Sequence, residues 1–310
     1  MIIHDMLEPY LQELLVRNYS VETIRRRRYS LGSFIRFLST RELILVEQLN
    51  VSVIEEYRDD LTFRHTVGDR HRKLTAQTRR GYLSVVRSFC DYLHDRDLLP
   101  DNPAENLIMP KIPKKLPGVI LTLEEIRMLI EVCDMQSNRG YRNRIILEML
   151  YDTAIRASEL CAVNIDNLDL AGGYLHVQSG KGDKDRIVPV SGRVCDLIRR
   201  YRMFIRETFV GGNDDGTLIL NRYGRMFNYK GILKIVKICA QKAGFTKNIT
   251  CHVFRHTCAT HMLQNGANIR VIQELLGHDS LTSTQIYTRL TIKDLKKAHD
   301  TFHPREQWEK

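Results

Sequence analysis

The residues best suited to chemistry lie near the C-terminal end of the chain, between His252 and Tyr287. His252 and Arg255 are three residues apart, so they share one face if this stretch is helical. His278 follows a Leu-Gly pair, and glycine commonly closes a helix. Guanidinium and imidazolium groups bind phosphate oxygens, and a phenol can attack phosphorus as a covalent nucleophile. This set of residue types therefore favours phosphoryl transfer without a metal.

The order of these residues is more informative than any one of them. His252-Val-Phe-Arg255, Leu276-Gly-His278 and Tyr287 together resemble the signature of the tyrosine recombinases, the phage integrase family. Each residue by itself is better explained as structural, for example as a hydrogen-bonded core histidine or a buried tyrosine. The complete ordered set is not explained in this way. The resemblance covers nearly the whole chain and is most specific from Thr153 to the end.

An earlier segment, Tyr151 to Leu160, resembles the first arginine box of that family. The resemblance implies that Arg156 clamps the scissile phosphate through two parallel hydrogen bonds. Glu159 lies three residues later and could orient this arginine. The alternative is a surface Arg–Glu pair on a helix. Ala154 stands where the family most often has glycine, which exchanges one small residue for another.

A glycine-rich segment, Ser179-Gly-Lys-Gly-Asp-Lys184, lies between two predicted strands and resembles the lysine loop of the family. Its glycines allow a hairpin tip to approach a nucleic-acid backbone closely. The resemblance favours Lys181 as the catalytic ammonium group, with Lys184 as the rival candidate. A nucleotide-binding P-loop is disfavoured because no Ser or Thr follows the lysine.

The resemblance implies a mechanism in which Tyr287 attacks the scissile phosphate to form a 3′-phosphotyrosine and Lys181 protonates the leaving 5′ oxygen. The positions that bind the phosphate or carry protons are Arg156, Arg255, His252 and His278. The protein–DNA ester conserves the bond energy, so neither ATP nor a metal nor another cofactor is expected. The implied partners are double-stranded DNA with an inverted-repeat core site and three further copies of the chain. A homotetramer then holds two duplexes, exchanging strands through a Holliday junction. A second recombinase or an accessory protein could also be required.

Composition agrees with a polyanionic partner. The 310-residue chain has a formal net charge of +10 and a pI near 9.3. Residues 1–110 carry 16 Lys+Arg and 16 Asp+Glu, so the excess lies beyond them. Seven scattered cysteines without a CxxC pair suit a reducing compartment. The start lacks a signal-peptide pattern, and no apolar run is long enough to span a membrane. We therefore expect a cytoplasmic, nucleoid-associated protein.

The apolar periodicity predicts a mainly α-helical fold with a small three-stranded antiparallel sheet. We expect three regions: a helical core-binding domain at 1–108, a basic Pro-rich linker at 109–118 and a catalytic domain at 119–310. By resemblance, the two domains form a C-shaped clamp on DNA. The predicted helices are 20–40, 52–63, one from 75, one from 122, 142–151, 191–209 and 229–243, and the predicted strands are 168–170, 174–177 and 186–190.

Two helices of the first domain carry candidate DNA contacts. Arg26 belongs to a run of four arginines, which cover every face of a helix, so a solvated surface is an equal alternative. The helix that starts near residue 75 carries short polar side chains and arginines on one broad face, which suits a helix that crosses a groove. These candidates are Thr78, Arg79, Arg80, Ser84 and Arg87.

A metal centre is the main chemical alternative. Several ligand-type residues gather near the C-terminus: Cys251, His252, His256, Cys258, His261 and His278. Their spacing matches neither a CxxC nor an HExxH zinc motif, so no metal is expected. Two functional alternatives also stay open, a type IB topoisomerase and a catalytically inert DNA-binding regulator. The sequence favours a recombinase of the Xer branch, acting in dimer resolution or in mobile-element integration and excision.

The tail after Tyr287 predicts a short amphipathic helix. Thr291 is a plausible cap and Asp294 lies at the favourable end of the helix dipole. An apolar stripe recurs along it, and Pro304 ends it. The members of the stripe are Ile292, Leu295, His299 and Phe302. We expect this helix to dock on a neighbouring protomer, with docking on its own domain as the alternative.

Overall fold

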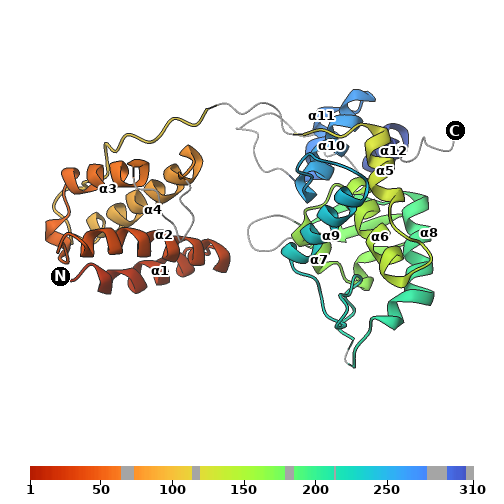
Figure 1. Cartoon of the computed structure of the whole chain (residues 1–310), viewed down its shortest axis with the longest axis horizontal. Helices are drawn as coiled ribbons and strands as arrows, with labels where there is room; N and C mark the ends of the chain where they lie inside the picture. The colour runs from red at the N-terminus through yellow and green to blue at the C-terminus, as the bar shows by residue number, and fades with distance from the viewer. Residues whose placement is uncertain (64–72, 114–118, 179–184, 213, 278–291, 305–310) are drawn as a thin grey trace. The chain divides into compact units, whose positions relative to one another are not determined.

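The computed structural model describes residues 1–63, 73–113, 119–178, 185–212, 214–277 and 292–304 (Figure 1). The chain divides into two compact units, Met1–Leu116 and Pro117–Lys310. The division falls inside the Pro- and Lys-rich stretch 109–118. No helix in the described part of the chain is long and apolar enough to cross a membrane.

The first unit is helical. Its helices are α1 (Leu7–Val16), α2 (Val21–Ser39), α3 (Val51–Phe63) and α4 (Ala76–His94), with short turns η1 (His4–Met6) and η2 (Val46–Gln48). The predicted starts of α2 and α4 are confirmed, because Ser20 and Thr75 each accept a hydrogen bond at 3.2 Å from the backbone N–H three residues later. The sequence prediction missed α1, although its buried residues recur at helical spacing: Leu7, Tyr10, Leu11 and Leu14.

Aromatic side chains from different helices form the core of the first unit. Tyr10 of α1 meets Phe89 and Tyr92 of α4 with ring centroids 5.4 Å apart in each pair. Phe34 of α2 lies 4.9 Å from Tyr57 of α3. Such edge-on and tilted ring pairs tie the helices together and fix the exposed faces that remain for a partner.

The second unit packs helices around a small sheet. Its helices are α5 (Leu123–Glu131), α6 (Asn138–Asp152), α7 (Ala157–Ala162), α8 (Gly192–Arg200), α9 (Tyr229–Lys242), α10 (Cys251–Gln264), α11 (Ile269–Leu276) and α12 (Ile292–Phe302). Short turns are η3 (Ile165–Asn167), η4 (Tyr201–Ile205) and η5 (Arg206–Thr208). Helix α6 is the central element, since eleven of its residues are buried and α5, α7, α8, α9 and α10 pack on it (Figure 1).

The sheet consists of β1 (Leu168–Asp169), β2 (Tyr174–Val177) and β3 (Arg186–Pro189). All pairs are antiparallel in the order β1-β2-β3. The predicted fold class, mainly α with a three-stranded antiparallel sheet, is therefore confirmed. Val177 pairs with Arg186, so this pair closes the hairpin at the base of the predicted lysine loop.

One predicted helix changes its type along its length. The sequence predicted a continuous helix over 191–209, and residues 192–208 are helical without a break, as α8 up to Arg200, then the π turn η4 and the 3-10 turn η5. The buried guanidinium of Arg206 explains the change, because it donates to the carbonyl of Thr217 and to the carboxylate of Asp214. These bonds hold Arg206 against the loop that contains Asp214 and Thr217, where the helix departs from regular α geometry.

In the single chain, the tail helix adopts the alternative of docking on its own domain; docking on a neighbouring protomer stays a prediction. Helix α12 packs on its own unit, against β3, α10 and α11. His299 and His303 are fully buried there, and the side-chain amide of Asn265 donates to the carbonyl of Phe302 at 3.0 Å. Polar contacts hold the helix in this position, and the apolar stripe of the sequence did not reveal them.

Candidate active site

Arg156 begins α7 and is held by Glu159. The backbone N–H of Arg156 donates to Oε2 of Glu159 at 2.7 Å, and Nη1 of Arg156 donates to Oε1 at 2.8 Å. The glutamate therefore caps the helix and orients the arginine at the same time. The Arg156 side chain is about 29% exposed, so it remains accessible to a ligand. Glu159 thus binds Arg156 as the sequence suggested.

A second arginine, Arg186, binds the same carboxylate group of Glu159. Nη1 and Nη2 of Arg186 donate to Oε1 and Oε2 of Glu159 at 3.0 and 2.8 Å. Burial raises the pKa of Glu159, but hydrogen bonds from Arg186 and Arg156 outweigh burial and hold it at about 2. The sequence analysis used Arg186 only as the start of a strand. The sequence offered one sign of a role for Arg186: it is a charged residue at the start of the strand that follows the lysine segment.

Arg255 lies on the buried side of α10. Its Nη1 donates to the carbonyl of Ala154 at 2.7 Å, and its Nη2 donates to the carbonyl of Leu276. Burial and, next, the positive charge of Arg156 together lower the pKa of Arg255 to about 10. The group is still a cation at neutral pH. Two like charges held close together in this way form a site suited to an anion.

The end of α11 brings the three arginines together. Consecutive carbonyls at this end accept hydrogen bonds from Arg186 (Leu275, 3.1 Å), Arg255 (Leu276) and Arg156 (Gly277, 3.4 Å). The last carbonyls of a helix lack partners within the helix and carry partial negative charge, so cations stabilise them. The sequence predicted the helix end at Gly277, which has φ of 61°, and this prediction is confirmed.

Ala154 has a backbone conformation that favours glycine. Its φ of 51° lies in the left-handed region, which costs a residue with a Cβ roughly 1 kcal/mol. The residue is fully buried, and its turn aims the carbonyl at Arg255. The strain is therefore located where the two active-site arginines meet.

The remaining predicted residues divide into two groups. His252 is exposed on the first turn of α10, three residues before Arg255. Lys181, its rival Lys184, His278 and Tyr287 lie outside the described residues. The described residues that flank them in the chain are Gln178 and Asp185 on either side of the lysines and Gly277 before His278.

The candidate DNA-contacting residues of α4 fall into two groups: some are exposed, and others are hydrogen-bonded to neighbouring parts of the first unit. Thr78, Arg80 and Ser84 are exposed. Arg79 is half-buried and donates to Oγ1 of Thr62 at 2.7 Å. Arg87 donates to the carbonyls of Ala104 and Leu107, at 3.1 and 2.6 Å, so it ties α4 to the segment that follows.

Arg26 of α2 is exposed and pairs with Glu22 at 3.1 Å. This is a surface pair of the kind that contributes little to stability and exchanges readily for a phosphate.

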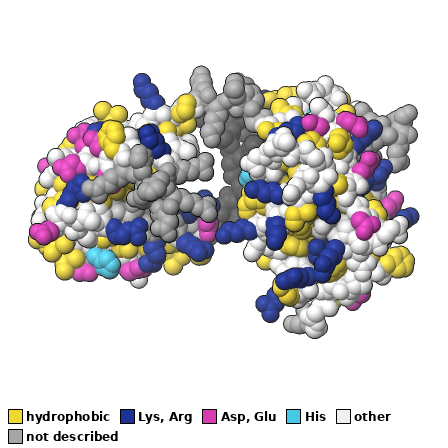
Figure 2. All heavy atoms as spheres, viewed as in Figure 1, with side chains coloured by type: hydrophobic (Ala, Val, Ile, Leu, Met, Phe, Trp, Pro, Cys, Tyr) yellow, Lys and Arg dark blue, Asp and Glu magenta, His cyan; other side chains and the backbone are white. Residues whose placement is uncertain are grey.

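The second unit carries a basic stripe that the sequence analysis missed. Lys230, Lys234 and Lys237 are exposed on α9 at a spacing of four and three, which puts them on one helix face. Figure 2 shows Lys and Arg side chains gathered on the part of this unit that α7 and α9 form. The missed signal was the spacing of the three lysines within the predicted helix 229–243.

The Cys and His residues weighed as a zinc site do not form one among the described positions. Burial raises the pKa of the Cys251 thiol to about 11 and raises that of Cys258 as well, so both are neutral thiols. His261 is buried, and its Nδ1 lies 2.9 Å from the hydroxyl of Tyr151. Burial lowers the pKa of His261, which keeps the ring neutral.

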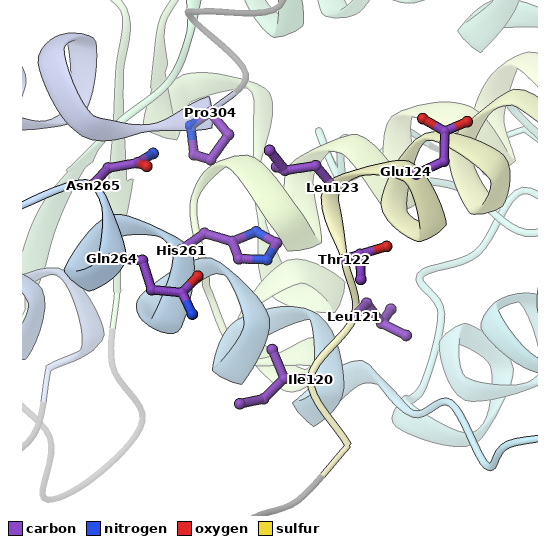
Figure 3. Close-up of a pocket in the computed structure, with 9 residues that line it drawn as sticks. All are labelled: Ile120, Leu121, Thr122, Leu123, Glu124, His261, Gln264, Asn265 and Pro304. Atoms are coloured by element: carbon purple, nitrogen blue, oxygen red, sulfur yellow. The ribbon is translucent and has the colours of Figure 1, made fainter.

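A shallow cavity of about 420 Å³ lies elsewhere in the second unit (Figure 3). Figure 3 shows His261, Gln264 and Asn265 of α10 facing the segment that leads into α5, with Pro304 at the rim. None of the three arginines lines it. Its mostly apolar walls do not suit a phosphate, so the arginine cluster is the better candidate for the reaction.

Comparison with known proteins identifies the family of the chain. Residues 120–293 match the phage integrase family, and residues 7–97 match the SAM-like N-terminal domain of phage integrases. The chain is 34% identical over 304 residues to the tyrosine recombinase XerD of Staphylococcus haemolyticus, covering 98% of this chain and 100% of the relative. It is 33% identical to the tyrosine recombinase XerC 2 of Ralstonia nicotianae, covering 98% and 87%.

A solved structure of a lambda integrase fragment, a dimer bound to a COC′ core site, has the same fold at 16% identity. Its TM-score is 0.70, and the match covers 93% of this chain and 100% of that one. The two family matches and the identity over nearly the full length of both curated relatives show the family. The chain belongs to the phage integrase family of site-specific tyrosine recombinases.

Proposed function

We propose that this protein cuts and rejoins double-stranded DNA at an inverted-repeat core site through a covalent 3′-phosphotyrosine on Tyr287. The observation that carries the proposal is the pair Arg156 and Arg255, held by adjacent carbonyls at the end of α11 despite their like charge. A phosphodiester that enters between them relieves their repulsion and binds guanidinium groups whose positions are already fixed.

Each step has a residue of suitable chemistry. Tyr287 attacks phosphorus, the P–O bond to the 5′ oxygen breaks, and Lys181 supplies the proton to that oxygen. Arg156 and Arg255 neutralise the non-bridging oxygens as charge develops in the transition state. His252 and His278 donate hydrogen bonds or carry the proton of the phenol. A 5′-hydroxyl from the partner duplex reverses the reaction, so neither ATP nor a metal enters the balance.

Basic and polar residues on α9 and α4 are proposed to bind the DNA backbone. The lysine stripe on α9 and the exposed residues of α4 are placed to contact phosphates, which fix the register of the protein on a duplex. The lambda integrase dimer on its core site supports DNA as the partner. We extend this to a homotetramer on two duplexes that exchanges strands through a Holliday junction, in the cytoplasm and near the nucleoid.

Covalent trapping tests the proposal. Wild-type protein incubated with a nicked suicide substrate is expected to give a protein–DNA adduct on a denaturing gel. Tyr287→Phe is expected to bind the same DNA and give no adduct, because only the nucleophilic oxygen is removed. The exposed Tyr223→Phe serves as the matched control and is expected to react at the wild-type rate. An adduct that persists in Tyr287→Phe would rule out Tyr287 as the nucleophile.

A further inference from the structure

A buried cluster outside the arginine site has the composition of a metal centre. Asp152 ends α6, and His299 and His303 lie at the end of α12. All three are completely buried. The backbone N–H of His303 donates to the carbonyl of His299 at 2.8 Å, so the two histidines sit one helical turn apart. A pair of histidines spaced by four residues on a helix presents two imidazoles to one ion.

The three side chains converge on one carboxylate oxygen. Nε2 of His299 lies 3.8 Å from Oδ1 of Asp152, and Nδ1 of His303 lies 3.9 Å from the same oxygen. One ligand atom from each residue falls within 4.8 Å of the others. Ligand atoms around a tetrahedral ion at 2.0–2.1 Å stand roughly 3.3 Å apart. Closing the site around an ion therefore requires the two nitrogen–oxygen distances to shorten by about half an ångström and the distance between the two ligand nitrogens to shorten by up to about 1.5 Å.

The surrounding hydrogen bonds orient the cluster. Nε2 of His303 bonds the carbonyl of Tyr151 at 3.2 Å, which leaves Nδ1 directed at Asp152. The backbone N–H of Ser191 donates to Oδ2 of Asp152 at 2.9 Å, whereas Oδ1 has no hydrogen-bond partner in the described structure. Metal-binding histidines commonly use the second ring nitrogen in this way, on a backbone carbonyl.

A buried carboxylate with one oxygen unsatisfied is costly unless a cation compensates it. We propose that Asp152, His299 and His303 bind a divalent transition metal, with zinc as the best fit to two imidazoles and one carboxylate. Binding requires His299 to release the 2.9 Å hydrogen bond between Nε2 and the carbonyl of Asp152 and to present that nitrogen without its proton.

The proposed role of the ion is structural. It links α12, which follows Tyr287 in the chain, to the end of α6, four residues before Arg156. The ion takes no part in the strand-transfer chemistry, since none of its ligands belongs to the arginine cluster. The sequence analysis expected no metal because it searched for local zinc motifs, and this ligand set joins residues 147 positions apart.

Metal titration of the full chain tests the proposal. Protein stripped with a chelator and dialysed is titrated with Zn²⁺ in a calorimeter and with Co²⁺ in a spectrophotometer. We expect one equivalent to bind, the melting temperature to rise, and Co²⁺ to show ligand-field bands without thiolate charge transfer. A charge-transfer band would assign the ion to cysteines such as Cys195 or Cys258 and overturn the proposal.

Variants locate the site. Asp152→Asn keeps the acceptor for the N–H of Ser191 and removes the charge, so the protein should stay folded by circular dichroism. It is expected to lower metal affinity at least about 100-fold, more than the loss of a residue that only supports a ligand. His303→Gln is expected to do the same, whereas the exposed His256→Gln is the matched control and should bind normally.

Two outcomes overturn the proposal. One is metal binding that is equal in wild type, Asp152→Asn and His303→Gln. The other is no stoichiometric binding to wild type, together with a melting temperature that depends on pH in wild type and not in Asp152→Asn. That second result would make the cluster a proton-binding site. Neither readout uses DNA, so the test is independent of the proposed function.

Discussion

Arg186 and Glu159 form a two-armed ion pair, with N–O distances of 3.0 and 2.8 Å, in which each side chain is at least nine-tenths buried. Glu159 also holds Arg156, so one carboxylate sets the position of two guanidinium groups. The pair connects the start of β3, which follows the lysine segment, to the start of α7, where Arg156 is the arginine proposed to bind the phosphate. The first three predictions concern these contacts and the chain around them.

Glu159→Gln is expected to lower the single-turnover cleavage rate by roughly 10- to 100-fold, because Arg156 loses its orienting charge. It should also reduce the free energy of unfolding. The pKa of Glu159 is depressed from 4.5 to about 2, so its contribution is present above pH 4.5 and is lost as the pH falls toward 2. The difference should reach about 3 kcal/mol at pH 7. Urea denaturation of the wild type and Glu159→Gln between pH 2.5 and 7 measures this difference in the free energy of unfolding. A difference that does not change with pH would contradict the lowered pKa of Glu159.

Arg186→Lys is expected to reduce cleavage while DNA binding is retained. Lysine preserves the charge but cannot donate to both oxygens of Glu159 and to the carbonyl of Leu275 at once. Arg186 is a positioning residue, so its loss should lower the rate of chemistry and leave the affinity for a half-site nearly unchanged. Gel shifts and trapping assays measure the two quantities. The exposed Arg139→Lys provides the matched control, and equal behaviour of the two variants would remove Arg186 from the site.

Gly277→Ala is expected to destabilise the second unit by roughly 1 kcal/mol or more and to impair cleavage. The residue has φ of 61°, and an added Cβ would lie 3.0 Å from Cδ of Arg186. Gly32→Ala on α2 is the matched control, because a Cβ there meets nothing within 4 Å. That substitution should stabilise the chain by about 0.5–1 kcal/mol. Thermal melts with two-state analysis compare them, and a stable, active Gly277→Ala would refute the role of the turn.

Arg80 and Arg87 should behave differently although they share a predicted DNA face. Arg80→Ala is expected to weaken DNA binding and to reduce the salt slope by about one, as for the loss of one phosphate contact. Arg87→Ala is expected to destabilise the first unit, because its guanidinium bonds the carbonyls of Ala104 and Leu107. Affinity at several salt concentrations and thermal stability distinguish the roles. The reverse assignment would follow if Arg87→Ala changed only the salt slope.

Lys181→Ala is expected to be rescued by a substrate with a 5′-thio leaving group, since a thiolate leaves without a proton. Cleavage rates on oxygen and sulfur substrates give the ratio. Lys184→Ala is the internal control and should show a much milder defect on the ordinary substrate. A defect of equal size on both substrates in Lys181→Ala would transfer the role of general acid to another group.

Local signals in the sequence were sufficient for much of the fold. Ser20, Thr75 and Thr122 mark helix starts that the structure contains, because a capping side chain acts within three residues. The sheet followed from alternation, and the end of α11 followed from Gly277. Each of these features depends on neighbours in the sequence.

The contacts that the sequence did not reveal join distant segments. Arg186 and Glu159 are 27 positions apart, and nothing near Arg186 indicates a carboxylate partner. His299 was assigned to an apolar stripe, although it reaches the carbonyl of Asp152. Periodicity identifies the buried face of a helix but not the polar group it meets. For the same reason, the candidate residues of α4 could be named together, whereas only the structure separates exposed Arg80 from tethered Arg87.

The convergence of three arginines on the end of α11 has a consequence for biosynthesis. Their positions, 156, 186 and 255, are spread over a hundred residues, and the carbonyls that gather them come last, at 275–277. A nascent chain released before Gly277 lacks the acceptors that hold these cations together. It carries the helices proposed to contact DNA but lacks the carbonyls on which the three arginines converge. Under the proposed function, a truncated product of this kind cannot assemble the phosphate site and is not expected to cut DNA.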